Sequence, residues 1–201
     1  MSKKLLLNTI DNTIDDTIFA IYTCDSVLVP ALPTGYSYEI EDQTLSNGYI
    51  KRTLRNNDGV YPSTISFEGK TKLKTVEYIR LDENVNSIRR MFYGCYNLTS
   101  VDLSSLDTKM VTNMRSTFEN CKALTSLDLS NFNTLNLTNI TYMFYDCSSL
   151  TYLDLSSFNT NLITNNTDVF YNVTTEAIIK VSSSFKLSER DCGWKGTFTV
   201  V

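Results

Sequence analysis

The side chains best suited to chemistry in this chain are carboxylates that recur at a fixed interval. Three aspartates are each 26 residues apart, a glutamate precedes them in a matching context, and a serine follows each aspartate two positions later. Carboxylates bind cations or a partner's Lys and Arg, and a pair of them can hydrolyse a glycosidic bond. The candidate binding residues are Glu77, Asp102, Asp128, Asp154, Ser104, Ser130 and Ser156.

The local pattern predicts that these carboxylates lie in a column. Around Asp128, apolar residues alternate with polar ones, which indicates a half-buried strand whose aspartate points to the open face. Neighbouring strands lie about 4.8 Å apart, so stacked units bring the carboxylates close enough to repel one another. A cationic patch or a metal could relieve the repulsion, as could solvent and the adjacent Ser and Thr side chains. The column ends at Lys180.

Three of the five cysteines, Cys95, Cys121 and Cys147, follow the same interval. A redox or metal site is one interpretation. The matching residue of the last unit is Val173, however, which a small buried apolar position would accept, so we expect these thiols in the core. The cysteine number is odd and no CxxC occurs, so a disulfide framework is not indicated.

Other routes to catalysis have little support in the sequence. The chain has no histidine, which excludes Ser-His-Asp triads and histidine-ligated zinc, and its seven glycines form no phosphate-binding loop. We therefore expect no catalytic residues, no metal and no cofactor. The net charge of −4 argues against nucleic acid as a partner.

The elements that position these residues belong to an internal repeat. Units begin at Leu98, Leu124 and Leu150, and an earlier copy begins at Leu73 with one residue deleted near 83–84. After the alternating segment, apolar residues follow the i, i+3, i+4, i+7 spacing of a two-turn helix, as at Ile140, Met143, Phe144 and Cys147. Residues suited to cap these helices precede them, namely Ser87, Asn113, Asn139 and Asn165.

Strand, turn and helix repeated about four times predict an α/β fold, a leucine-rich-repeat-like right-handed solenoid of 26-residue units over residues 71–173. Residues 174–201 are expected to form a β C-terminal cap, with Trp194 and Phe198 covering the last layer. Residues 1–70 are expected to form a small β-rich attachment or capping piece, in which Asn47-Gly48 marks a turn. Within it, a short four-residue repeat (Thr9-Ile10-Asp11, Thr13-Ile14-Asp15, Thr17-Ile18) leads into the apolar residues 18–22, which could form a helix or a strand pair.

The motifs MFYGC, MFYDC, LTSLDLSNFNT and LTYLDLSSFNT resemble the BspA-type leucine-rich repeats, also described as DUF285, of bacterial surface proteins. The resemblance covers residues 73–173. It implies a right-handed solenoid and a role in adhesion or protein binding, without enzyme activity. Two features depart from the pattern: the usual asparagine ladder is replaced by Leu106, Phe132 and Phe158, and the N-terminus lacks an export signal.

The leading hypothesis is a non-enzymatic protein-binding or structural module, joined through its N-terminal piece to a larger assembly such as a bacteriophage virion or tail. The open face would take a cationic or glycan ligand. Alternatives are a bacterial cell-surface adhesin and a carbohydrate-active enzyme. The apolar run after Lys4 stops at Asn8, so we expect neither a signal peptide nor a transmembrane segment, and localisation at a virion or at the cell surface.

Overall fold

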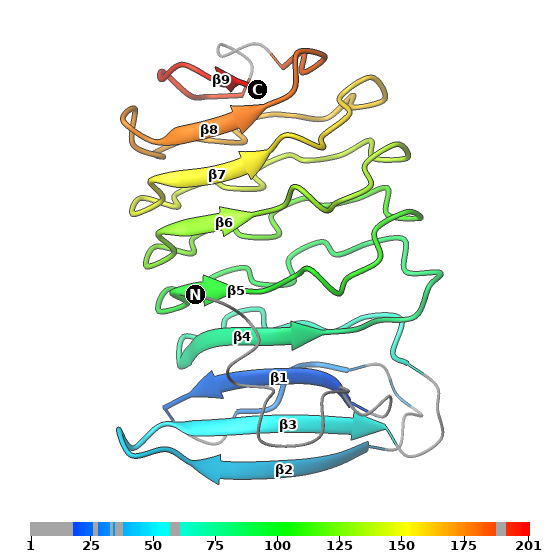
Figure 1. The fold of residues 1–201 in the computed structure, drawn as a ribbon, viewed down its shortest axis with the longest axis vertical. Coiled ribbons are helices and arrows are strands. Elements are labelled where there is room, and N and C mark those ends of the chain that lie inside the picture. The colour runs from blue at the N-terminus through cyan, green and yellow to red at the C-terminus, as the bar shows by residue number, and fades with distance from the viewer. Residues whose placement is uncertain (1–17, 26–27, 33, 35–37, 57–60, 188–191) are drawn as a thin grey trace.

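A computed structural model describes residues 18–25, 28–32, 34, 38–56, 61–187 and 192–201. The described residues form nine strands in two sheets. A five-stranded sheet has the order β2-β3-β1-β4-β5, and a four-stranded sheet has the order β6-β7-β8-β9 (Figure 1). The strands are β1 (Ile18–Cys24), β2 (Tyr38–Thr44), β3 (Ile50–Asn56), β4 (Leu73–Ile79), β5 (Ser100–Val101), β6 (Ser126–Asp128), β7 (Tyr152–Leu155), β8 (Ile178–Val181) and β9 (Thr199–Val200).

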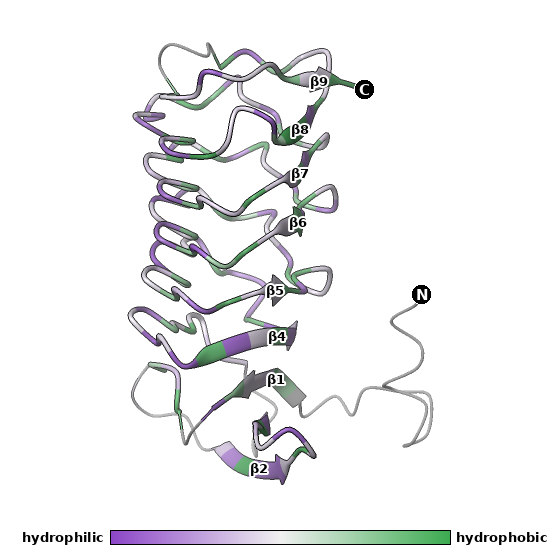
Figure 2. Ribbon diagram, turned by 90° about the vertical axis from the view of Figure 1, so that its left-hand side faces the viewer, coloured by the Kyte–Doolittle hydropathy of each residue, from purple (hydrophilic) through white to green (hydrophobic). Residues whose placement is uncertain are grey.

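The expected strand-turn-helix solenoid is wrong, because the described residues contain no helix. The second half of each unit is instead a run of turns that lies opposite the strands (Figure 2). Each run contains two residues with positive φ, four positions apart, and a right-handed helix cannot accommodate such residues. They are Arg90 and Gly94, Ser116 and Asn120, Tyr142 and Asp146, and Asp168 and Asn172.

Hydrogen bonding between units replaces the helical pattern. The N–H of Phe144 donates to the carbonyl of Val169 in the next unit at 2.9 Å, whereas the N–H of Tyr145 closes a local turn onto Tyr142 at 3.2 Å. This alternation runs through every unit, so consecutive β-turns are tied sideways to their neighbours. Buried residues of such turns recur every three or four positions, and the sequence pattern therefore imitates a helical face.

The residues expected as helix caps have a related local role. Asn113 and Asn139 form isolated parallel bridges with the neighbouring units. The Asn139 Oδ1 accepts the N–H of Thr141 at 3.0 Å, and the Asn113 Oδ1 accepts the N–H of Arg115 at 3.0 Å. A side-chain oxygen that accepts the N–H two residues on forms an Asx turn, which needs the same residue types as a helix N-cap.

The strand half of each unit alternates between buried and exposed residues. Leu127 and Leu129 are buried, and Ser126 and Asp128 are exposed. The register between units is 25 residues at Thr75 and Ser100 but 26 residues where Ser87 forms a bridge with Asn113. One residue is therefore missing from the first unit between these points, as the sequence alignment near residues 83–84 predicts.

The core is a column of aromatic rings that continues from unit to unit. The stacked rings lie 5.4 to 5.7 Å apart, centroid to centroid. They belong to Phe67, Phe92, Phe118, Phe144 and Phe170. Because each unit exposes its ring to the next one, no unit can bury its apolar surface alone, and the stack must be closed at both ends.

The N-terminal strands close one end of the stack. β1 lies between β3 and β4 and is antiparallel to both, so the strand alternative for residues 18–22 is the observed one. The turn at Asn47-Gly48 joins β2 to β3, and Gly48 has a φ of 82°. The repeated four-residue motif before residue 18 lies outside the described residues. Since β1 pairs with β4, the five-stranded sheet crosses the domain boundary predicted near residue 70.

The C-terminal residues cover the other end. The ring of Trp194 lies 6.0 Å from that of Phe170, and Phe198 lies 5.9 Å from Phe170. Trp194 is buried, and β9 adds a last parallel strand to β8. In the part of the chain that the structure describes, no helix is long and apolar enough to cross a membrane.

Candidate functional site

A pocket of about 660 Å³ opens where the two sheets meet. β5 and β6 are consecutive in the stack (Figure 1) but belong to different sheets. The residues that line the pocket come from both sides of this break. The volume of the pocket falls within the range of about 300–1,000 Å³ typical of ligand sites. The lining residues are Ile21, Thr75, Val76, Glu77, Tyr78, Ser100, Val101, Asp102, Leu103, Ser104, Ser105, Asp128, Ser130 and Asn131.

Five of the seven candidate binding residues line this pocket, and two do not. Glu77 lies on β4, Asp102 directly follows the adjacent strand β5, and Asp128 ends β6. Ser104 and Ser130 complete the set. Asp154 and Ser156 belong to the next unit, where Asp154 pairs with Asp128 on one side and with Lys180 on the other. The structure therefore gathers the first part of the column into a concave site and leaves the last part outside it.

Each aspartate of the column is held by the serine two residues later. The Oδ1 atoms of Asp102, Asp128 and Asp154 accept the serine N–H groups at 2.9, 2.9 and 3.0 Å. The Ser130 hydroxyl also donates to Asp128 at 2.6 Å. These Asx turns fix the direction of the carboxylates. Adjacent serines are thus the hydrogen-bond partners of the aspartates, which is one of the ways of relieving the repulsion that the sequence allows.

The chain itself supplies a lysine at both ends of the column. The Lys51 Nζ lies 2.7 Å from Glu77 Oε2, and the Thr23 hydroxyl donates to the same carboxylate at 3.2 Å. At the other end, the Lys180 Nζ lies 3.9 Å from Asp154 Oδ2 and above the ring of Tyr152, 5.2 Å from its centroid.

The surroundings of Asp154 keep it ionised. Burial raises the pKa of its carboxyl, but hydrogen bonds from Ser156 and Tyr152 and the charge of Lys180 outweigh burial, so the pKa lies below its usual value. Hydrogen bonding to Tyr152 raises the pKa of Lys180. Within the chain itself, therefore, Lys180 contacts both Asp154 and Tyr152 on this face of the sheet.

The sequence reasoning missed the apolar wall of the pocket. Ile21 comes from β1 and is the register partner of Tyr78 on β4, and Val101 comes from β5. No local pattern indicates Ile21, because the two paired strands are far apart in the chain. Thr75 and Ser100 could have been predicted from the sequence as lining residues. Each lies two positions before an acidic residue and therefore on the same face of its strand.

The cysteine column is part of the core. The Sγ–H groups of Cys95, Cys121 and Cys147 donate to the carbonyls of Phe67, Phe92 and Phe118 at 3.0, 3.2 and 3.0 Å. Burial raises the pKa of Cys95 and of Cys147 to about 12, and that of Cys121 well above its usual value. Among the described residues, no group of three or more His, Cys, Asp or Glu is arranged to hold a metal ion.

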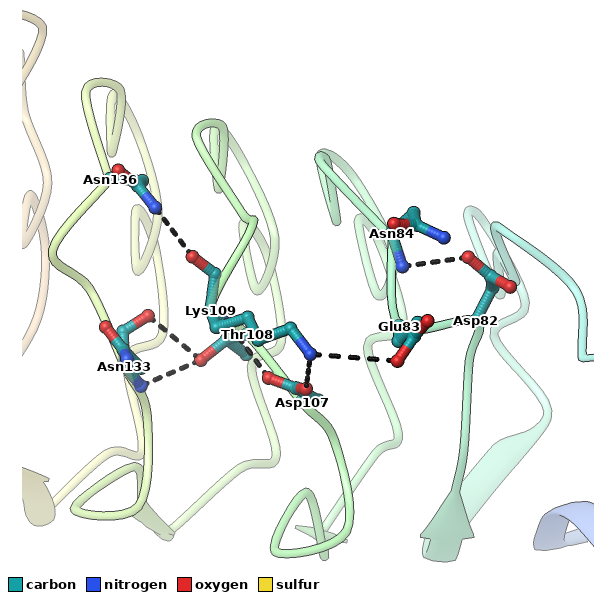
Figure 3. A network of polar contacts seen from close by, with 8 residues as sticks. All are labelled: Asp82, Glu83, Asn84, Asp107, Thr108, Lys109, Asn133 and Asn136. Carbon is teal, nitrogen blue, oxygen red and sulfur yellow. Dashed lines mark hydrogen bonds and ion pairs between the residues drawn. The ribbon is translucent and has the colours of Figure 1, made fainter.

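A second polar network, along one edge of the stack, ties the units together (Figure 3). The Thr108 hydroxyl donates to the carbonyl of Asn133 at 3.1 Å and accepts the N–H of the same residue at 2.8 Å. The hydroxyls of Thr134 and Thr160 accept N–H groups of the following units at 2.7 and 2.9 Å. All three threonines are buried, so we assign these hydrogen bonds a structural role, namely to join successive units.

Comparison with protein-family models matches residues 66–182 to a family described as "Mycoplasma protein of unknown function, DUF285". No curated protein and no solved structure matches the chain.

Proposed function

The chain belongs to the DUF285 family, and from this premise we propose that it is a non-enzymatic binding module that presents the pocket between β4, β5 and β6 to a protein partner. The observation that supports the proposal is the convergence of Glu77, Asp102 and Asp128 in one concave site of ligand-binding size. Repeat proteins commonly bind their partners through an extended face built from equivalent positions of successive units.

The chemistry of the chain favours binding over catalysis. Glycoside hydrolysis by a carboxylate pair needs one group that stays protonated near neutral pH, and Asp154 does not suit that role because its pKa is lowered. The buried thiols at Cys121 and Cys147 have raised pKa values and so are poor nucleophiles. Without histidine, the chain also lacks the commonest general base.

The finer family assignment belongs to the same proposal. The motifs MFYGC and MFYDC favour the BspA-type repeats, which implies a role in adhesion or protein binding. The proposed partner is a protein, and attachment to a larger assembly would use surfaces of the N-terminal strands.

The proposal is tested by comparing what three forms of the full chain capture from an extract of the cells that make it. The forms are the unmodified chain, a pocket variant (Asp102→Asn with Asp128→Asn) and a control variant (Asp82→Asn with Asp107→Asn), whose carboxylates form Asx turns outside the pocket. Asn keeps the Asx-turn acceptor, as Asn113 and Asn139 show, so both variants should fold.

We expect at least one protein to be captured equally by the unmodified chain and the control variant, and to be depleted with the pocket variant. The proposal fails if capture does not distinguish the two variants. It fails equally if the unmodified chain hydrolyses a glycan and the pocket variant does not.

A further inference from the structure

We infer that the free edge of β2 accepts an extended segment of a partner protein as an additional strand, and that this segment carries Lys or Arg on one face and apolar residues on the other. The inference goes beyond the proposed function, because it concerns the outer edge of the N-terminal strands and not the pocket.

The edge of β2 is open along its length. β2 is the outermost strand of the five-stranded sheet (Figure 1), and among the described residues no strand pairs with its second edge. Such an edge presents backbone donors and acceptors to which another strand can add. Proteins blunt exposed edges with proline, lysine or bulges. The seven residues of β2 include neither proline nor lysine, and its register with β3 has no bulge.

The hairpin geometry identifies the backbone groups that face outwards. The N–H of Leu45 donates to the carbonyl of Tyr49 at 2.8 Å, so the backbone of Leu45 points to the β3 side. In an antiparallel pair, inward and outward positions alternate. The backbone N–H and carbonyl groups of Thr44, Asp42 and Ile40 therefore point away from β3, towards the free edge.

One face of this edge favours basic residues in an added strand. Glu39 and Glu41 lie on the same face and are exposed, and 69% of the Glu41 side chain is accessible. On β3, Arg55 is the register partner of Glu39 and contacts Glu41 at 3.3 Å. Opposite charges on neighbouring strands stabilise a sheet. Lys or Arg in an added strand would repeat on the outer side of β2 the pairing that Arg55 makes on the inner side.

The other face favours apolar residues. Ile40 is the register partner of Leu54, which is fully buried, but Ile40 itself is 43% exposed. The ring of Tyr38, on the same face as Ile40, lies 6.3 Å from that of Phe19 in the core. An apolar side chain next to Ile40 would continue this core by one strand. The partner segment should therefore alternate between basic and apolar residues.

β2 is held in place before a partner arrives. The buried Arg52 of β3 binds both oxygens of Asp42, with Nε 2.6 Å from Oδ1 and Nη2 2.5 Å from Oδ2. Bidentate pairs of this kind fix geometry as well as adding energy. Little conformational entropy of β2 is then lost when a strand adds to it.

Charge also argues against a second copy of this chain as the occupant. Two β2 strands paired antiparallel would bring Glu39 and Glu41 of both copies to one face. Like charges on neighbouring strands are destabilising. A segment with Lys or Arg at alternate positions avoids this repulsion.

The probe is a fluorescent peptide, acetyl-Lys-Ile-Lys-Val-Lys-Val-Lys-amide, whose binding to the full chain is measured by anisotropy. One matched peptide replaces every Lys by Glu, and another keeps the sequence but carries a methyl group on every backbone nitrogen. We expect the unmodified lysine peptide to bind at least about tenfold more tightly than either of them. Equal binding of the N-methylated peptide would overturn the inference, because strand pairing would then play no part. Equal binding of the glutamate peptide would overturn the basic character of the segment.

Variants of Ile40 test whether the peptide pairs with this edge. Ile40→Pro removes an N–H that points outwards and leaves the ladder with β3 complete, whereas Ile40→Val keeps the N–H. We expect Ile40→Pro to weaken the lysine peptide at least about tenfold and Ile40→Val to change it by less than about twofold. Thermal unfolding checks that both variants fold. Equal binding by folded Ile40→Pro and Ile40→Val would overturn the inference.

A charge variant gives the same test without proline. We expect Glu39→Gln with Glu41→Gln to weaken the lysine peptide about fivefold, and the pocket variant, Asp102→Asn with Asp128→Asn, to change it by less than about twofold. Both variants remove two negative charges. An equal loss would therefore mean diffuse attraction to an acidic protein, and it would overturn the inference.

The native mass of the full chain tests the alternative occupant. A dimer that Ile40→Pro converts to a monomer would show that a second copy fills the edge, and would overturn the inference. The pocket variant leaves β2 unchanged, so failure of the capture test with that variant counts against the proposed function alone. Failure of the peptide test counts against the strand-binding edge alone.

Discussion

At the scale of the residue, the cysteine column shows how burial sets chemistry. Cys95, Cys121 and Cys147 are free thiols with no exposed surface, and each donates a hydrogen bond to a phenylalanine carbonyl of the preceding unit. Desolvation disfavours the thiolate, so the folded chain holds these protons at a pH where an unfolded chain releases them. The column therefore couples stability to pH on the alkaline side.

We predict that the free energy of unfolding falls as the pH rises above the ordinary thiol pKa of 9.0. A raised folded pKa means that this contribution is fully present below the unfolded pKa and is lost above it, by about 1.4 kcal/mol per pH unit for each thiol. Urea unfolding between about pH 8 and pH 10.5 measures the slope. Cys121→Val should reduce this slope of unfolding free energy against pH by the contribution of one thiol. An unchanged slope would show that Cys121 does not hold its proton.

At the scale of the element, residues with a positive φ distinguish a run of turns from a helix. Asn120 has a φ of 64°, and glycine occupies the equivalent position in the first unit, at Gly94, with a φ of 68°. In a turn at this φ, Gly is favoured and Ala is strained, whereas in a helix Ala is favoured over Asn and Gly.

We predict that Asn120→Ala lowers the free energy of unfolding by about 1–2 kcal/mol and that Asn120→Gly leaves it unchanged within about 0.5 kcal/mol. The two variants lose the same polar side chain, so their difference reports the backbone alone. Chemical denaturation measures both values. A helical segment would give the reverse order, with Ala more stable than Gly.

At the scale of the whole molecule, the N-terminal strands are part of the stack. β1 supplies the central strand between β3 and β4, and the ring of Tyr22 packs 5.0 Å from that of Phe67, which begins the phenylalanine column. A stack of repeated units whose first layer is open exposes apolar surface that the next layer would otherwise cover.

We therefore predict that a truncated chain starting at Lys70 does not fold cooperatively. Removing β1, β2, β3 and Phe67 leaves β4 without its antiparallel partner and Phe92 without its outer neighbour. Circular dichroism during thermal unfolding and limited proteolysis compare it with the full chain. A sharp transition and a protease-resistant product would contradict the prediction and would show that the repeats fold without the N-terminal strands.

The sequence by itself determined the features that depend on local periodicity. The 26-residue repeat, the half-buried strand at Leu127 and Leu129, the deleted residue near 83–84 and the burial of the cysteines all follow from spacing and residue type. The family follows from the repeat motifs. Each of these needs only the rule that one face of a repeated segment is covered by its neighbours.

Only the tertiary structure decided between helix and turns, and it also formed the pocket. The spacing of Ile140, Met143, Phe144 and Cys147 suits both, and the choice depends on hydrogen bonds such as that from Phe144 to Val169 of the next unit. The pocket needs Ile21, brought to Tyr78 by pairing between β1 and β4, and a break between β5 and β6. These contacts join residues distant in the chain, so no local pattern encodes them: their free energy arises only when the layers are stacked.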